Sequence, residues 1–110
     1  MINRDDVTLK EKENDGQTVF LYYDDLAGVY LAYGLSAYYT TLVTNPIISF
    51  SMKMNMPVAL LMRENVLGLR QSMIKVEHRQ KEFYHFKMKT LIGDAGYEKW
   101  EKKIREKHEG

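Results

Sequence analysis

Several residue types and motifs that indicate a particular chemistry are missing from this sequence. Its 110 residues include no cysteine and only two prolines. The absence of cysteine excludes disulfides, thiolate metal sites and cysteine nucleophiles, and it fits a reducing compartment. The sequence also contains no dinucleotide-binding glycine motif, no phosphate loop, no nucleophile elbow and no zinc motif. These absences favour a non-catalytic protein with no metal and no cofactor, and they leave open an enzyme whose polar pocket assembles only on folding.

A long apolar segment is missing as well. The first residues, Met1 to Asp6, lack the basic region followed by an apolar run that marks a signal peptide. Lys53 interrupts the longest later apolar stretch well short of the length that spans a bilayer. We expect a cytoplasmic protein that has no membrane partner.

The composition that remains is typical of a globular protein. Hydrophobic residues make up 45% of the chain and charged residues 28%, which is too apolar for wholesale disorder. The length suits one domain. We expect residues 1–16 to form a polar N-terminal arm, frayed or with a brief helical turn at Val7 to Glu13, because few of their side chains are apolar. Residues 17–110 would then form a single α+β domain.

The most apolar segment, Val19 to Thr44, contains six of the eight tyrosines. Residues 19–23 and 29–33 are short runs of β-branched, aromatic and aliphatic residues, which are typical of strands. The five residues between them, 24–28, end in a glycine and are short enough for an antiparallel hairpin. Apolar residues at three- and four-residue spacing then predict a helix over 35–43, which the following Asn-Pro ends.

The second half of the chain predicts further strands and helices. Residues 47–54 alternate in part between apolar and polar side chains, as in a half-buried strand, and residues 58–62 are an unbroken apolar run, as in an interior strand. Asn65 can cap a helix over 65–73. Residues 74–88 fit either a hairpin that turns through Arg79 to Glu82 or a continuation of that helix. Their aromatic content favours the hairpin.

The C-terminal segment predicts a helix that packs on the sheet. Asp94 can cap it, and Tyr97, Trp100 and Ile104 share one face over residues 95–107. The predicted fold is therefore a single α+β domain with a mixed or mostly antiparallel sheet and three helices, one of them this C-terminal amphipathic helix.

Charge is distributed unevenly along the chain and suggests one binding site. Residues 1–69 carry five Lys and Arg against eight Asp and Glu, whereas residues 70–110 carry eleven against seven. Basic residues could pair with phosphates, and an exposed ring among them could stack on a base. A solvated polar face explains the same residues. The candidate nucleic-acid contacts are Arg70, Lys75, Arg79, Lys81, Tyr84, Lys87 and Lys89.

Two other polar groups could carry chemistry. Asp24 and Asp25 form an acidic pair that could bind a hard metal or share a proton, but adjacent aspartates in a loop more often end a strand and begin a turn. His78 and His85 could meet across the predicted second hairpin, although a metal site needs further ligands. We predict a turn for the first group and no metal at the second.

Part of the chain resembles a known family. Leu9-Lys10 followed by residues 19–37 is similar to the opening of the N-terminal mismatch-recognition domain of MutS-type DNA repair proteins. In that family an apolar strand leads into a Gly-Asp-Phe-Tyr-Glu-x-Phe-Gly-x-Asp-Ala pattern and then a helix. Met56-Pro57 followed by residues 66–69 resembles the domain's next strand and helix. The residues that match the pattern are Tyr30, Tyr33, Gly34 and Ala37.

The positions that would recognise a mismatch differ from the family pattern. The base-stacking phenylalanine falls on Val29, the mismatch-contacting glutamate on Leu31, and the Gly-Asp pair on Ala27-Gly28. Mismatch recognition is therefore not implied for this chain. What the resemblance implies is a mixed sheet flanked by helices.

These observations lead to two functional hypotheses. The first is a small non-catalytic binding or protein-interaction module, which binds a partner protein or self-associates through an exposed edge strand or a Met- and Tyr-rich surface. The alternative is a nucleic-acid-binding accessory protein that uses the basic segment 70–89.

Overall fold

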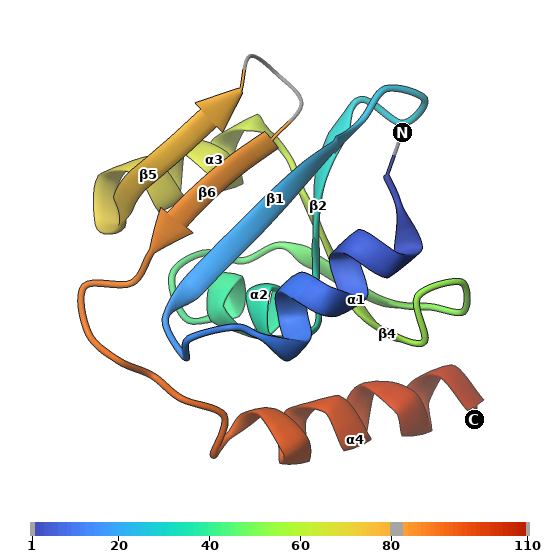
Figure 1. Cartoon of the computed structure of the whole chain (residues 1–110). Coiled ribbons are helices and arrows are strands. Elements are labelled where there is room, and N and C mark those ends of the chain that lie inside the picture. Colours follow the sequence, from blue (N-terminus) through green and yellow to red (C-terminus); the bar gives the residue numbers. More distant parts are fainter. Residues whose placement is uncertain (1, 80–82, 110) are drawn as a thin grey trace.

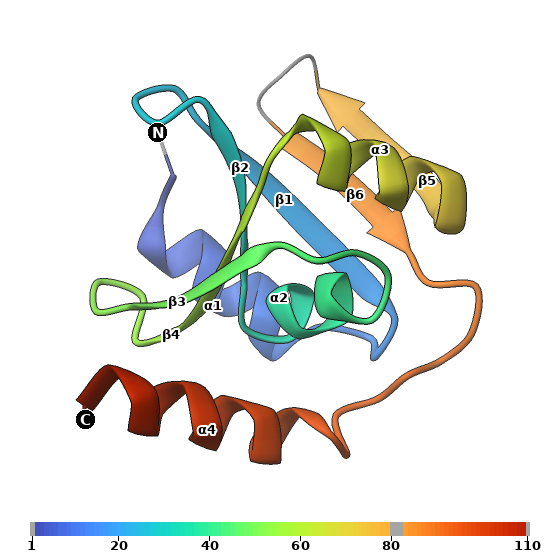
Figure 2. The ribbon, with the colours of Figure 1, turned by 180° about the vertical axis from the view of Figure 1, so that it is seen from behind.

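Six antiparallel strands form one sheet in the order β3-β4-β2-β1-β6-β5 (Figures 1 and 2). The structure is a computed structural model that describes residues 2–79 and 83–109. Its strands are β1 (Thr18–Asp24), β2 (Val29–Tyr33), β3 (Ile47–Ser51), β4 (Met56–Leu61), β5 (Ile74–Arg79) and β6 (Phe83–Lys87), and its helices are α1 (Arg4–Lys12), α2 (Gly34–Thr41), α3 (Arg63–Ser72) and α4 (Tyr97–Glu109). The α+β class is confirmed, and the sheet is wholly antiparallel in the described part of the chain.

The prediction of three helices was wrong, because α1 is a fourth helix. The Asn3 side chain accepts a hydrogen bond from the backbone N–H of Asp6 at 3.0 Å and so caps the helix start. Val7 is completely buried against the sheet, where it contacts Tyr22 and Tyr33. A few well-placed apolar side chains are enough to dock a helix whose sequence is otherwise polar.

Residues 74–79 and 83–87 pair as antiparallel strands, as the aromatic content of this segment predicts. β6 pairs with β5 on one side and with β1 on the other, so that Val19 lies opposite Phe86 and Leu21 opposite Tyr84. This pairing across the sheet favours extended backbone over a continued helix. Residues 80–82, which include most of the predicted turn, lie outside the described residues.

The helices cover the two faces of the sheet unequally. Figures 1 and 2 show α1 on one face and α2 and α3 on the other, and we call these the α1 face and the α2 face. The main core lies on the α2 face, where Tyr39 of α2 and Leu69 of α3 pack against Leu21 and Phe86. Alternation along each strand directs neighbouring side chains to opposite faces.

Helix α4 packs on the α2 face beside α2, near the β3 end of the sheet. Figure 2 shows it alongside the β3–β4 hairpin, and Trp100 packs against the main core as predicted. The Trp100 ring lies 5.4 Å from that of Tyr38 in α2. At 13 residues α4 is the longest helix, and none of the helices in residues 2–79 and 83–109 is long and apolar enough to cross a membrane.

Candidate functional site

The residues predicted to contact nucleic acid lie on both faces of the sheet. Arg70 of α3 donates a hydrogen bond to the Tyr84 hydroxyl oxygen at 2.6 Å, on the α2 face. Lys87 lies three residues further along β6 and therefore on the α1 face. Lys75 and Lys89 are exposed, whereas Lys81 and the side chain of Arg79 lie outside the described part of the chain.

Tyr84 is a core residue rather than an exposed ring. Its side chain is 5% exposed and stacks on Phe86, with the two ring centres 5.4 Å apart and the ring planes 15° from parallel. The Arg70 guanidinium lies 5.3 Å from the centre of the Tyr84 ring. Both groups are thus engaged with each other, and binding through the 70–89 segment stays a prediction.

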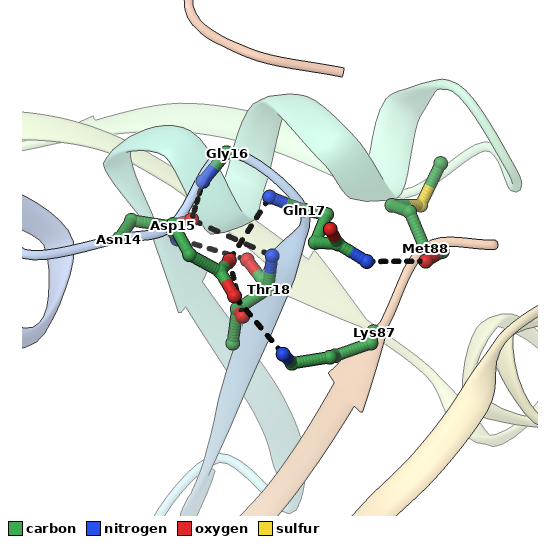
Figure 3. Close-up of polar contacts among 7 residues, drawn as sticks. All are labelled: Asn14, Asp15, Gly16, Gln17, Thr18, Lys87 and Met88. Carbon is green, nitrogen blue, oxygen red and sulfur yellow. Dashed lines mark hydrogen bonds and ion pairs between the residues drawn. The ribbon is translucent and has the colours of Figure 1, made fainter. Parts of the chain in front are cut away.

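Lys87 ties the end of β6 to the loop before β1. Its ammonium group lies 3.1 Å from the Asp15 carboxylate, which also accepts a hydrogen bond from the Thr18 hydroxyl at 2.6 Å (Figure 3). Burial alone would raise the pKa of Asp15, but the hydrogen bonds from Thr18 and Lys87 outweigh it, and the pKa is lowered. Lys87 therefore has a structural partner within the chain.

The acidic pair forms a turn. The Asp24 carboxylate accepts hydrogen bonds from the backbone N–H of Leu26 at 3.0 Å and of Ala27 at 3.4 Å, which closes the loop between β1 and β2. The side chain of His78 lies outside the described residues. Within the described ranges, no three carboxylate or imidazole groups are placed to hold one metal ion.

A buried carboxylate in α1 was missed by sequence analysis. Glu11 is 7% exposed, and its two oxygens accept hydrogen bonds from the Ser36 N–H at 3.0 Å and the Ser36 hydroxyl at 2.6 Å. The Ser36 oxygen in turn accepts the Phe20 N–H at 3.0 Å. Glu11 therefore caps the start of α2 from another helix, because Tyr33 at the N-cap supplies no side-chain hydrogen bond.

Burial raises the pKa of Glu11 from 4.5 to about 7, although the hydrogen bonds from Ser36 and Asn14 oppose this shift. Ser36 is completely buried, so a substrate cannot reach its hydroxyl. The pair links α1, α2 and β1 and has a structural role.

The approach of α1 to α2 requires glycine at position 34. Gly34 has a φ of +56°, and a Cβ there would lie 3.3 Å from the Met56 sulfur and 3.5 Å from Cγ of Glu11. We expect Gly34→Ala to lower the free energy of unfolding by about 1–2 kcal/mol, measured by urea denaturation. The matched control is Gly68→Ala in α3, where a Cβ would meet the Thr44 hydroxyl at an ordinary 3.6 Å.

The control should raise the free energy of unfolding by up to about 1 kcal/mol, because alanine favours a helix interior. Equal effects of the two alanine substitutions would contradict the proposed tight contact between α1 and α2.

The two edge strands of the sheet differ in how they are protected. β5 contains Lys75, Glu77 and Arg79, and its register with β6 shifts between Lys75 and Glu77. Charged residues and bulges are the usual devices that prevent an edge from pairing with another chain. β3, by contrast, contains no charged residue, since its sequence is Ile, Ile, Ser, Phe and Ser. It pairs with β4 without a register shift, and the side chain of Ile47 is 57% exposed. It is the unprotected edge.

The pairing of β3 with β4 leaves backbone groups of β3 directed outward. Phe50 lies opposite Pro57, which has no N–H, so this pair cannot be one that exchanges hydrogen bonds. The bonded and non-bonded pairs alternate, so Ile48 also belongs to a non-bonded pair. The N–H and C=O groups of Ile48 and Phe50 therefore point away from β4, toward the open edge.

A hollow of about 230 Å³ lies where this edge meets α4. Its lining is Ile48, Ser49, Phe50, Ile104, Lys107 and His108. It adjoins a second hollow of about 480 Å³, which shares Ile104 and Lys107 and adds Trp100, Lys103 and Glu106. The apolar lining residues of the combined surface are Ile48, Phe50, Trp100 and Ile104, and its charged rim consists of two lysines, Lys103 and Lys107, and one glutamate, Glu106. We call this surface the β3–α4 groove.

Arg105 fixes α4 beside β3. Its guanidinium donates to the Asn55 carbonyl oxygen at 2.9 Å and to the Asn55 side-chain oxygen at 3.2 Å, in the turn between β3 and β4. It also lies 4.7 Å from the centre of the Phe50 ring. These contacts position the helix wall of the groove relative to the strand.

No family model matches this chain, and neither a curated protein nor a solved structure matches it. The resemblance to the mismatch-recognition domain of MutS-type proteins therefore stays a prediction.

Sequence analysis identified the components of the groove separately. It predicted a half-buried strand over residues 47–54, whose apolar and polar side chains alternate in part, and it placed Trp100 and Ile104 on one face of a helix. The missing information was the strand order, which makes β3 an edge. The contrast between the uncharged β3 and the charged β5 is a signal that could have indicated it.

Proposed function

We propose that this protein is a small interaction module that binds a partner protein by adding the partner's strand to β3. The observation that carries the proposal is the unprotected β3 edge, whose outward backbone groups at Ile48 and Phe50 lie beside the β3–α4 groove. In strand addition, backbone hydrogen bonds supply affinity and pockets for alternate side chains supply specificity. At this edge, the outward N–H and C=O groups of β3 would supply the hydrogen bonds, and the β3–α4 groove would supply the pockets.

Matched substitutions at the two edges test the proposal. Ile47 and Ile74 are each the first residue of an edge strand and are exposed to similar extents, 57% and 54%. We expect Ile47→Lys to reduce the amount of partner protein that the purified chain pulls down from lysate at least about tenfold, because a lysine on an edge strand opposes pairing with another strand. We expect Ile74→Lys to leave capture unchanged. Quantitative pulldown with sedimentation of the same samples measures both.

Amide hydrogen exchange gives a second readout at residue level. The N–H groups of Ile48 and Phe50 should exchange rapidly in the free protein and become protected in the complex, whereas the Ser49 N–H, which faces β4, should be protected in both. Equal loss of capture with Ile47→Lys and Ile74→Lys, or unchanged exchange at Ile48 and Phe50, would refute binding at β3.

A further inference from the structure

The β3–α4 groove carries chemical information about the strand it would accept. Ile48 and Phe50 point to the α2 face, where Ile104 of α4 lies beside them. A strand paired with β3 would direct every second side chain to this face, and an apolar residue there would contact these three side chains. The opposite face of β3 presents Ile47, Ser49 and Ser51, which are uncharged.

The rim of the groove favours carboxylates in the partner. Lys103 and Lys107 are exposed one helical turn apart on either side of Ile104, and neither forms an ion pair with any described residue. Alternate residues on one face of a strand are about 7 Å apart. Carboxylates two positions before and after an apolar residue are therefore about 14 Å apart. The backbones of Lys103 and Lys107 are only about 6 Å apart, so the two long side chains would have to extend in opposite directions along the groove to reach them.

The same charges disfavour a second copy of this chain as the partner. Residues 45–53 contain no Asp or Glu and one lysine, Lys53. An antiparallel pair of β3 strands has its twofold axis perpendicular to the sheet, so both copies of α4 would lie on the same face. The rims that contain Lys103 and Lys107 would then face each other, and like charges would repel.

We infer that the partner of β3 is an extended segment in which an apolar residue is flanked, two positions away on each side, by carboxylates that pair with Lys103 and Lys107. This inference rests on the proposed function. The backbone of the segment pairs with Ile48 and Phe50, its apolar side chain enters the groove between β3 and α4, and its acidic side chains bind the rim.

A pair of labelled peptides tests the inference. The probe is Ser-Glu-Thr-Leu-Thr-Glu-Ser, whose threonines favour extended backbone and face the uncharged side of β3. The matched peptide replaces both glutamates by lysine. Fluorescence anisotropy with the full chain at low and moderate salt should detect binding of the acidic peptide, weaker binding as salt rises, and no binding of the basic peptide.

Charge-reversal variants locate the acidic contacts. Lys103→Glu with Lys107→Glu should weaken binding of the acidic peptide at least about tenfold, since two attractions become repulsions. The control, Lys99→Glu with Lys102→Glu, makes the same change in net charge on exposed positions of α4 outside the groove lining. It should change binding less than about twofold.

The outcomes separate this inference from the proposed function. Equal binding of both peptides, equal loss in both charge-reversal variants, or binding of neither peptide would overturn the acidic segment. A different result would keep the proposed function. If Ile47→Lys abolishes binding of a partner protein or of a second copy while Ile74→Lys preserves it, strand addition at β3 is supported, but the added strand is not the acidic segment. If neither substitution affects any association, both proposals fail.

Discussion

Raising the pH from about 5 to about 8 should lower the free energy of unfolding by about 2.5 kcal/mol through Glu11 alone. The pKa of Glu11 is about 7 in the folded chain, against 4.5 for an ordinary glutamate. Between these values the unfolded chain releases this proton while the folded chain retains it. The stabilising effect of Glu11 is therefore complete when the pH is below its pKa in the unfolded chain, and it is lost as the pH rises through its pKa in the folded chain.

Urea denaturation across this pH range should be carried out on two matched variants. Glu11→Gln should lose the pH dependence, because glutamine, like the protonated acid, is neutral and can both accept from the Ser36 N–H and donate to its hydroxyl oxygen. Glu13→Gln changes an exposed glutamate two residues away and should keep it. The difference between the two variants isolates Glu11 from the other titratable groups that both variants share. Parallel pH profiles of the two variants would show that Glu11 isn't the group responsible.

Tyr39→Ala should lower the free energy of unfolding by about 3–5 kcal/mol, because it removes a large side chain from the main core. Tyr39 is completely buried among the side chains of β1, α3 and β6, and its hydroxyl donates to the Gly93 carbonyl oxygen at 2.7 Å. Burial raises the pKa of Tyr39 to about 12, so this donor keeps its proton at neutral pH. The residue therefore holds both the core and the connection that leads to α4.

The two contributions of Tyr39 can be separated. Tyr39→Phe keeps the packing and removes only the hydrogen bond, so the expected loss is about 1–2 kcal/mol. Chemical denaturation followed by circular dichroism measures both variants, and Tyr39→Phe remains informative if the alanine variant does not fold. A loss below about 1 kcal/mol for Tyr39→Ala would show that this ring does not support the core.

Local sequence patterns predicted the elements whose signals lie within about ten residues. The β1–β2 hairpin follows from two apolar runs separated by a short loop that ends in Gly28, which adopts a φ of +68°. Helix α4 follows from the spacing of Tyr97, Trp100 and Ile104. Its observed start, two residues after the predicted one, lies within the usual uncertainty of helix ends.

Helix α1 and Glu11 could not be inferred in this way. A glutamate among charged residues resembles a solvated one in sequence, and only the folded chain brings it to Ser36, 25 residues away. Tyr84 shows the converse, since an aromatic ring among basic residues suggested an exposed platform. The pairing of Leu21 with Tyr84 across the sheet places that ring in the core instead.

By itself, the sequence determined the α+β class, the β1–β2 hairpin and the C-terminal helix, because each depends on periodicity and turn residues that are close together along the chain. Only the tertiary structure decided which strands are edges and which backbone groups of β3 point outward. Strand order depends on long-range pairings, such as that of residues 18–22 with 83–87. The β3–α4 groove exists because α4 packs beside a strand about 50 residues earlier in the chain.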